Sequence, residues 1–158
     1  DVGLRDVVVT GVQTCALPIS PARGLALSAL PVDTFFAHLI MAMPDADATG
    51  CMVDLAAALS VWRRPVTLPR GEEGRQVMAA WQPQPCDATT LIQAVRQRPP
   101  LELQPNLAAR DEARKLATQT RRNLGLPEIP GSLAESVACV WGVAGRVARE
   151  GVCVVREK

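Results

Sequence analysis

The residues best suited to chemistry are four arginines in the segment NLAARDEARKLATQTRRNL, residues 106–124. On a helix, Arg110, Arg114 and Arg121 would project within about 40° of one another, with Arg122 on the next quarter of the surface. Guanidinium groups bind phosphate oxygens and displace counterions. The spacing therefore predicts a ridge that could bind a nucleic-acid backbone with salt-dependent affinity.

An ordinary solvated helix surface would carry similar charges. Asp111 and Lys115 stand at the i, i+4 spacing of a helical ion pair, and charged residues are usual on the solvent side of a helix. The spacing alone favours this ordinary interpretation.

No other set of residues suggests catalysis. The chain has no phosphate loop, dinucleotide fingerprint, zinc-protease motif or nucleophile elbow. His38 is the single histidine, and base catalysis needs a nucleophile and an orienting partner that the sequence does not offer. We therefore predict no catalytic, cofactor-binding or metal-binding residues.

The cysteines point to the same conclusion. Outside the first 19 residues they contain no C-x-x-C pair, and no histidine stands at ligand spacing, so a zinc site is not supported. We expect buried free thiols at Cys51, Cys86, Cys139 and Cys153.

The first 19 residues do not look like part of the protein. The string VTGVQTCALPI, residues 9–19, matches the translated tail of a common short-read sequencing adapter, residue for residue. A secretory signal would need a basic start and a longer apolar run, whereas an edge strand over DVVVT is the remaining structural alternative. We interpret residues 1–19, with Cys15, as an artefact that marks where the parent sequence was cut.

Composition favours closely packed helices. Hydrophobic residues make up 48% of the chain, but aromatic residues only 3%, so the core must consist of Ala, Leu and Val. The formal net charge of +1 points to no particular partner. No apolar run approaches the roughly 18 residues of a membrane span, and we expect a cytoplasmic protein with no membrane contact.

Apolar periodicity predicts five helices. The first is capped by Asp33 and ends at Pro44. The second opens near Thr49–Gly50 and is stopped by Pro65, with Asp54 opposite its apolar side, which comprises Met52, Leu55, Ala56, Leu59 and Trp62. Residues 64–85 read as a long connection with one short helix around 77–81.

The remaining helices have clear end signals. The third starts at Asp87 and ends before Pro99–Pro100. The fourth is capped by Asn106 and stopped by Gly125, and its narrow apolar side is made of small residues. The fifth starts at Ser132 and Glu135, a capping box, and residues 151–158 read as a β-strand without a partner strand.

Several of these segments resemble one family. RGLALSALPVDTFFAHLIMAM is similar to the join between the winged-helix and helical domains of DEAH-box ATP-dependent helicases of the bacterial HrpB kind. GCMVDLAAALS and DATTLIQAVRQ resemble that family's next helices, NLAARDEARKLATQTRRNLGLP its long basic helix, and SLAESVACVWGVAGRVARE the helix after it. GVCVVREK resembles the first strand of an OB-like fold. The proline-rich segment 64–85 departs from the pattern.

The resemblance implies a mainly α fold: a helical bundle, the helicase-associated ratchet domain, over residues 20–150, and the start of an OB-like β segment at 151–158. In such helicases this domain holds single-stranded RNA or DNA against two upstream RecA-like domains, which bind ATP and Mg. The ATPase motifs would lie upstream of Ser20, so this fragment should need no cofactor and be inactive by itself. Arg110, Arg114, Arg121 and Arg122 are then the expected nucleic-acid contacts.

Two alternatives stay open. The chain could be a non-enzymatic, all-α interaction module whose Ala-rich helix surfaces bind a partner helix. The chimeric sequence could also encode no expressed protein as written, although the helical periodicity and caps from Ser20 onward are rarely supplied by a random reading frame.

Overall fold

The computed structural model describes residues 21–67, 71–81 and 87–131. These ranges contain six α-helices and one short 3₁₀ helix. They are α1 (Pro21–Ser28), α2 (Thr34–Met41), α3 (Ala46–Ser60), α4 (Glu72–Trp81), α5 (Asp87–Arg96), η1 (Leu101–Leu103) and α6 (Leu107–Leu124). No strand occurs in them, so the prediction of a mainly α protein is confirmed. The expected artefact at 1–19, the fifth helix from Ser132 and the strand at 151–158 lie outside the described residues.

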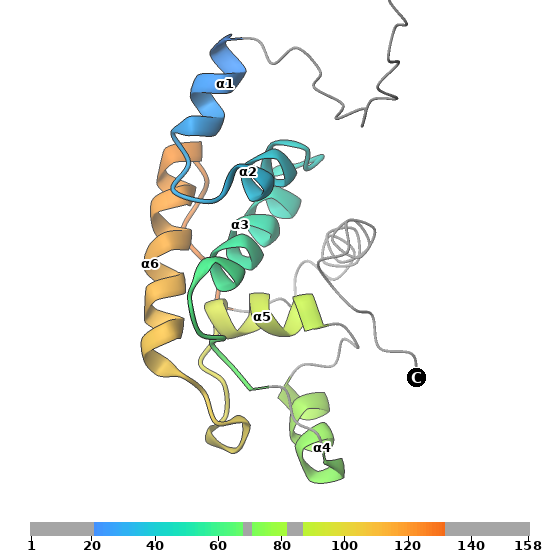
Figure 1. The fold of residues 1–158 in the computed structure, drawn as a ribbon. Helices are drawn as coiled ribbons and strands as arrows, with labels where there is room; N and C mark the ends of the chain where they lie inside the picture. Colours follow the sequence, from blue (N-terminus) through green and yellow to red (C-terminus); the bar gives the residue numbers. More distant parts are fainter. Residues whose placement is uncertain (1–20, 68–70, 82–86, 132–158) are drawn as a thin grey trace, which may run out of the picture.

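Helix α3 is the centre of the bundle (Figure 1). It packs most extensively against α6 and α5, and also against α2. Every residue from Gly50 to Ala58 is buried. Apart from Asp54 these residues are apolar or glycine on every side of the helix, and such a helix belongs inside a core, which the surrounding helices supply.

The contact between α3 and α6 is built from small side chains. On α6 the buried residues include Ala109, Ala113 and Ala117, none more than 6% exposed. Alanine lets two helix backbones approach closely. The small-residue side of α6 is thus covered by α3, so the interaction-module alternative would need a different surface of this helix.

Helices α2 and α6 begin at the capping residues that the sequence predicts. The Asp33 carboxylate accepts a hydrogen bond from the Phe35 backbone N–H at 2.8 Å. The Asn106 side chain accepts one from the Ala109 N–H at 3.1 Å. At the far end of α6, Gly125 takes the left-handed conformation, with φ of 66°, which glycine adopts without strain. The predicted bounds of α6 are confirmed at both ends.

The second predicted helix was partly wrong. It starts earlier than Thr49, because the carboxylate of Asp45 caps α3 through the Ala48 N–H at 2.7 Å. It also ends earlier, at Ser60, because Val61 is extended and turns into the core. Trp62 therefore lies beyond the helix and is 95% exposed, whereas the apolar pattern placed it on the buried side.

Two further differences concern the ends of the bundle. Helix α1 was not predicted, and α4 starts at Glu72, five residues before the short helix expected around 77–81. Both lie at the periphery of the bundle (Figure 1). None of the helices described is long and apolar enough to cross a membrane.

Candidate nucleic-acid interface and its buried support

A charged triad lies at the centre of the bundle, where α3, α5 and α6 meet. The Asp54 carboxylate of α3 is 0% exposed and accepts hydrogen bonds from two arginines. Arg96 of α5 donates through Nε at 2.7 Å. Arg121 of α6 donates through Nε at 3.1 Å and through Nη2 at 2.8 Å. The Asp54 side chain thereby links α3 to α5 and α6 through hydrogen bonds.

Other N–H groups of the two arginines also find acceptors. Arg121 donates to the Gly50 carbonyl at 3.0 Å and to the Pro127 carbonyl at 3.2 Å. Arg96 donates to the Cys51 sulfur at 3.3 Å. Buried charges are tolerated when they are paired and hydrogen-bonded, and this triad meets both conditions.

The environment of Arg96 strengthens its charge. Burial by itself lowers the pKa of Arg96, but the attraction of Asp54 and Cys51 and the hydrogen bonds to them outweigh burial, so the pKa is raised above its ordinary value. The guanidinium therefore stays charged at any ordinary pH.

Two other predicted arginines hold the end of α5. Arg110 donates through Nε to the Ala94 carbonyl at 2.8 Å. Arg114 donates through Nη1 to the Val95 and Arg96 carbonyls at 2.8 and 3.1 Å. The last carbonyls of a helix lack intrahelical partners and carry partial negative charge, so these guanidinium groups cap α5 from α6.

Because Arg110 and Arg114 both cap α5, their two positive charges lie close together. Burial lowers the pKa of Arg110, repulsion from Arg114 and Arg98 lowers it further, and Asp111 opposes the change only in part. Asp111 itself lies 3.7 Å from Arg110 and is 66% exposed, so it neutralises the group weakly. Arg98, Arg110 and Arg114 thus form a cluster with excess positive charge.

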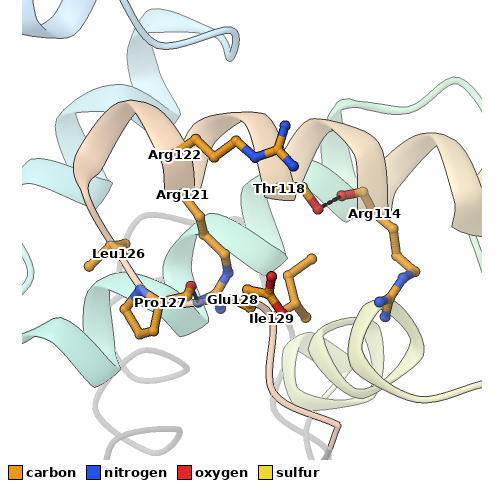
Figure 2. A pocket seen from close by; sticks show the side chains of 8 residues that line it. All are labelled: Arg114, Thr118, Arg121, Arg122, Leu126, Pro127, Glu128 and Ile129. Atoms are coloured by element: carbon orange, nitrogen blue, oxygen red, sulfur yellow. Dashed lines mark hydrogen bonds between the residues drawn. The ribbon is translucent and has the colours of Figure 1, made fainter.

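An open pocket of about 250 Å³ continues this positive charge along α6. It lies between α6 and the segment that follows, and eight residues line it: Arg114, Thr118, Arg121, Arg122, Leu126, Pro127, Glu128 and Ile129. Figure 2 shows Arg122 extended along the helix toward Thr118, while Arg121 points away from it toward Pro127. The volume is below the roughly 300–1,000 Å³ of ordinary small-molecule sites, so we interpret the pocket as a notch in a larger surface.

The structure divides the four predicted contact residues into three kinds. Arg121 does not lie on the expected ridge, because its guanidinium is buried on Asp54 and its side chain is only 4% exposed. The Arg110 side chain, 14% exposed, and the half-buried Arg114 lie against α5. Arg122 is the one residue of the four that is exposed. The angular spacing of Arg110, Arg114 and Arg121 predicted that they share one exposed surface. An arginine side chain is long enough, however, for its guanidinium to reach a neighbouring helix.

The sequence interpretation missed Arg96 and misjudged Asp54. Asp54 was expected opposite the apolar side of its helix, yet α3 is covered on all sides and the carboxylate is buried. A single acidic residue in the apolar run CMVDLAAAL was the available signal, since an acid in such a run needs a buried partner. Which arginine provides it depends on tertiary structure.

The remaining candidate residues form no site. His38 is half-buried on α2. Cys51 is buried and not in a disulfide, as expected, while Cys86, Cys139 and Cys153 lie outside the described residues. Within residues 21–67, 71–81 and 87–131, no group of three or more His, Cys, Asp or Glu side chains is placed to hold a metal ion.

Comparison of the chain with protein-family models, with curated protein sequences and with solved structures finds no match. The class established by the structure is that of an all-α bundle, in the part described, with a buried Asp–Arg–Arg triad and a positively charged surface along α6.

Proposed function

We propose that this chain is a helical nucleic-acid-binding domain that holds single-stranded RNA or DNA by its phosphates, as the ratchet domain of a cytoplasmic DEAH-type ATP-dependent helicase does. The surface we assign to this role is the basic tract, defined as Arg98, Arg110, Arg114 and Arg122. Upstream RecA-like domains, with ATP and Mg, would complete such an enzyme, and this chain supplies only the strand-holding part.

The observation that carries the proposal is the position of Arg114. It belongs both to the cluster with Arg98 and Arg110 and to the pocket that Arg122 lines. Between Arg110 and Arg122 lie about 18 Å of helix at 1.5 Å per residue. The positive charges are therefore spread along the helix and are not concentrated at one point. This distribution fits a linear polyanion.

The two arginines that cap α5 can serve both roles. Arg110 uses Nε and Arg114 uses Nη1 for the carbonyls of α5. Each guanidinium has five N–H donors in a rigid fork, so donors remain for a phosphate oxygen. Because α5 fixes these side chains in advance, little conformational entropy is lost when a strand binds.

The test is binding of a labelled single-stranded oligonucleotide to the full chain, followed by fluorescence anisotropy, with RNA and DNA measured separately. Three or four phosphate contacts predict that affinity falls roughly 20- to 50-fold when salt rises from about 50 to about 200 mM, at a slope of about −0.7 per contact. Affinity that is insensitive to salt would contradict the proposal for both kinds of strand.

Arg122→Ala is the informative substitution, because this side chain is exposed and supports no other helix. We expect it to reduce the salt slope by about 0.7 and to weaken binding about fivefold near 0.1 M salt. Arg75→Ala is the matched control, because it also removes one positive charge from an exposed position. Arg75 lies on α4, where it pairs with Glu72 at 2.7 Å, and it is not part of the basic tract. Equal effects of both substitutions would indicate a general charge effect and not the basic tract. Arg121→Ala is unsuitable as a binding test, since it opens the core.

A further inference from the structure

Trp62 has the most exposed large apolar side chain among the residues described, at 95%. The two residues after it, Arg63 and Arg64, are exposed as well. Neither guanidinium forms an ion pair with a carboxylate in the part of the chain that the structure describes. A bare indole beside two available cations has the composition of a surface that contacts a partner carrying both rings and negative charge.

The backbone of this surface is held firmly. Val61, at 8% exposure, and Val66, at 0%, are buried on either side of the three exposed residues. Pro65 fixes its own φ and disfavours helical backbone at Arg64. The loop is thus anchored at both ends by apolar side chains, and the exposure of Trp62 does not come from a loose chain end.

The loop is also attached to the helix that carries the basic tract. The backbone N–H of Asn106 donates to the Pro65 carbonyl at 3.0 Å, and Asn106 is the N-cap of α6. Arg110, the first arginine of α6 in the tract, follows one helical turn later, about 6 Å along the axis.

We propose that residues 62–64 form a base-stacking site for single-stranded nucleic acid, in which the Trp62 indole stacks on an unpaired base and Arg63 and Arg64 contact the flanking phosphates. Proteins that bind single strands without sequence preference combine aromatic stacking surfaces with cationic side chains that follow the backbone. The proposal rests on the proposed function, because it names a second contact on the same strand. It adds a contact to the bases, which the basic tract does not provide.

The position of this site favours a nucleic acid over a protein partner. Tryptophan and arginine are both enriched in protein interfaces, so the argument rests on the attachment of this loop to α6, the helix that carries most of the basic tract. Stacking also tolerates every base, since each has a π surface. The site should therefore show little base preference.

The experiment compares a base-bearing oligonucleotide with an abasic sugar-phosphate strand of equal length, measured by anisotropy and by tryptophan fluorescence. The base-bearing strand should quench Trp62, and Trp62→Ala should remove this quenching and weaken binding at least about fivefold. Binding of the abasic strand should not change. Trp62→Phe should recover part of the affinity, because a phenyl ring also stacks. Leu101→Ala, which removes another exposed apolar side chain, 73% exposed, should have no effect.

Other outcomes overturn the proposal in distinguishable ways. If Arg122→Ala weakens binding but Trp62→Ala does not, the basic tract binds the strand and the stacking site is wrong. If Trp62→Ala weakens the abasic and base-bearing strands equally, Trp62 does not stack on bases. If sedimentation shows a dimer that Trp62→Ala converts to a monomer, the surface is covered by a second copy of the chain. If no strand binds at any salt concentration, the proposed function fails, and this site with it.

Discussion

Replacing Asp54 with alanine should destabilise the bundle by about 3–5 kcal/mol, the cost of removing one partner from a buried ion pair. Asp54 accepts hydrogen bonds from Arg96 and Arg121, and both side chains are at most 4% exposed. The loss should not double, because Arg121 keeps the Gly50 and Pro127 carbonyls and Arg96 keeps the Cys51 sulfur. Since domains are stable by about 5–15 kcal/mol, this one change should remove about a fifth or more of the total.

The assay is urea unfolding followed by the helical circular dichroism signal. With a denaturant dependence near 2 kcal/mol per M, the midpoint should fall by about 2 M. Glu72→Ala is the control, because it also removes one carboxylate paired with an arginine, but in an exposed pair worth at most about 1 kcal/mol. A midpoint for Asp54→Ala within about 0.3 M of the unaltered chain would refute the assignment of the triad as a support of the fold.

A second comparison separates the charge from the packing. Replacing all three members, with Asp54→Leu, Arg96→Met and Arg121→Leu, leaves no unpaired charge inside the bundle. Buried ion pairs replaced by apolar residues of similar volume are often neutral or stabilising. The triple variant should therefore be more stable than Asp54→Ala, and a triple variant that is less stable would contradict the unpaired-charge explanation.

Two predictions use neighbouring positions as their own controls. Arg121→Ala should lower the free energy of unfolding in urea by several kcal/mol, because it leaves Asp54 without its partner on α6. Arg122→Ala should change that free energy by less than about 0.5 kcal/mol. Equal losses would contradict the assignment of Arg121 to the core and Arg122 to the surface. Gly50→Ala would place a Cβ 3.1 Å from Arg121 Nη2 and 3.2 Å from Nη1, and the guanidinium is held by Asp54 and cannot yield. We expect a loss of about 1–3 kcal/mol from this overpacking, partly offset by the better helix propensity of alanine, about 1 kcal/mol. Gly71→Ala, with open space around its Cβ, should leave the unfolding midpoint unchanged.

The limits of α6 could be predicted because they depend on local chemistry. The Asn106 side chain bonds a backbone N–H three residues away, and Gly125 supplies a left-handed residue at the other end. Both signals lie within one turn of the boundary they define. The same holds for the start of α2 at Asp33. Sequence reasoning is effective where a residue and its partner are close in the chain.

The triad could not be predicted for the opposite reason. Asp54 is separated from Arg96 by 42 residues and from Arg121 by 67. Angular spacing on α6 placed Arg121 near Arg110 and Arg114, but it gave no information about which residue of a neighbouring helix each guanidinium would contact. The end of α3 was mispredicted likewise, because the burial of Val61 and Val66 is a tertiary effect that overrides the periodicity of Trp62.

The separation of Asp54 from its partners also has a consequence for how the chain folds. Small side chains recur along both α3 and α6, so apolar contact alone would discriminate weakly against pairings shifted by a turn. In a shifted pairing Asp54 would be buried without Arg121, at a cost of about 3–5 kcal/mol, a large part of the stability of a small domain. The ion pair between Asp54 and Arg121, which are 67 residues apart, should therefore select one helix register, and refolding of Asp54→Leu/Arg96→Met/Arg121→Leu should populate misaligned compact species that the unaltered chain avoids.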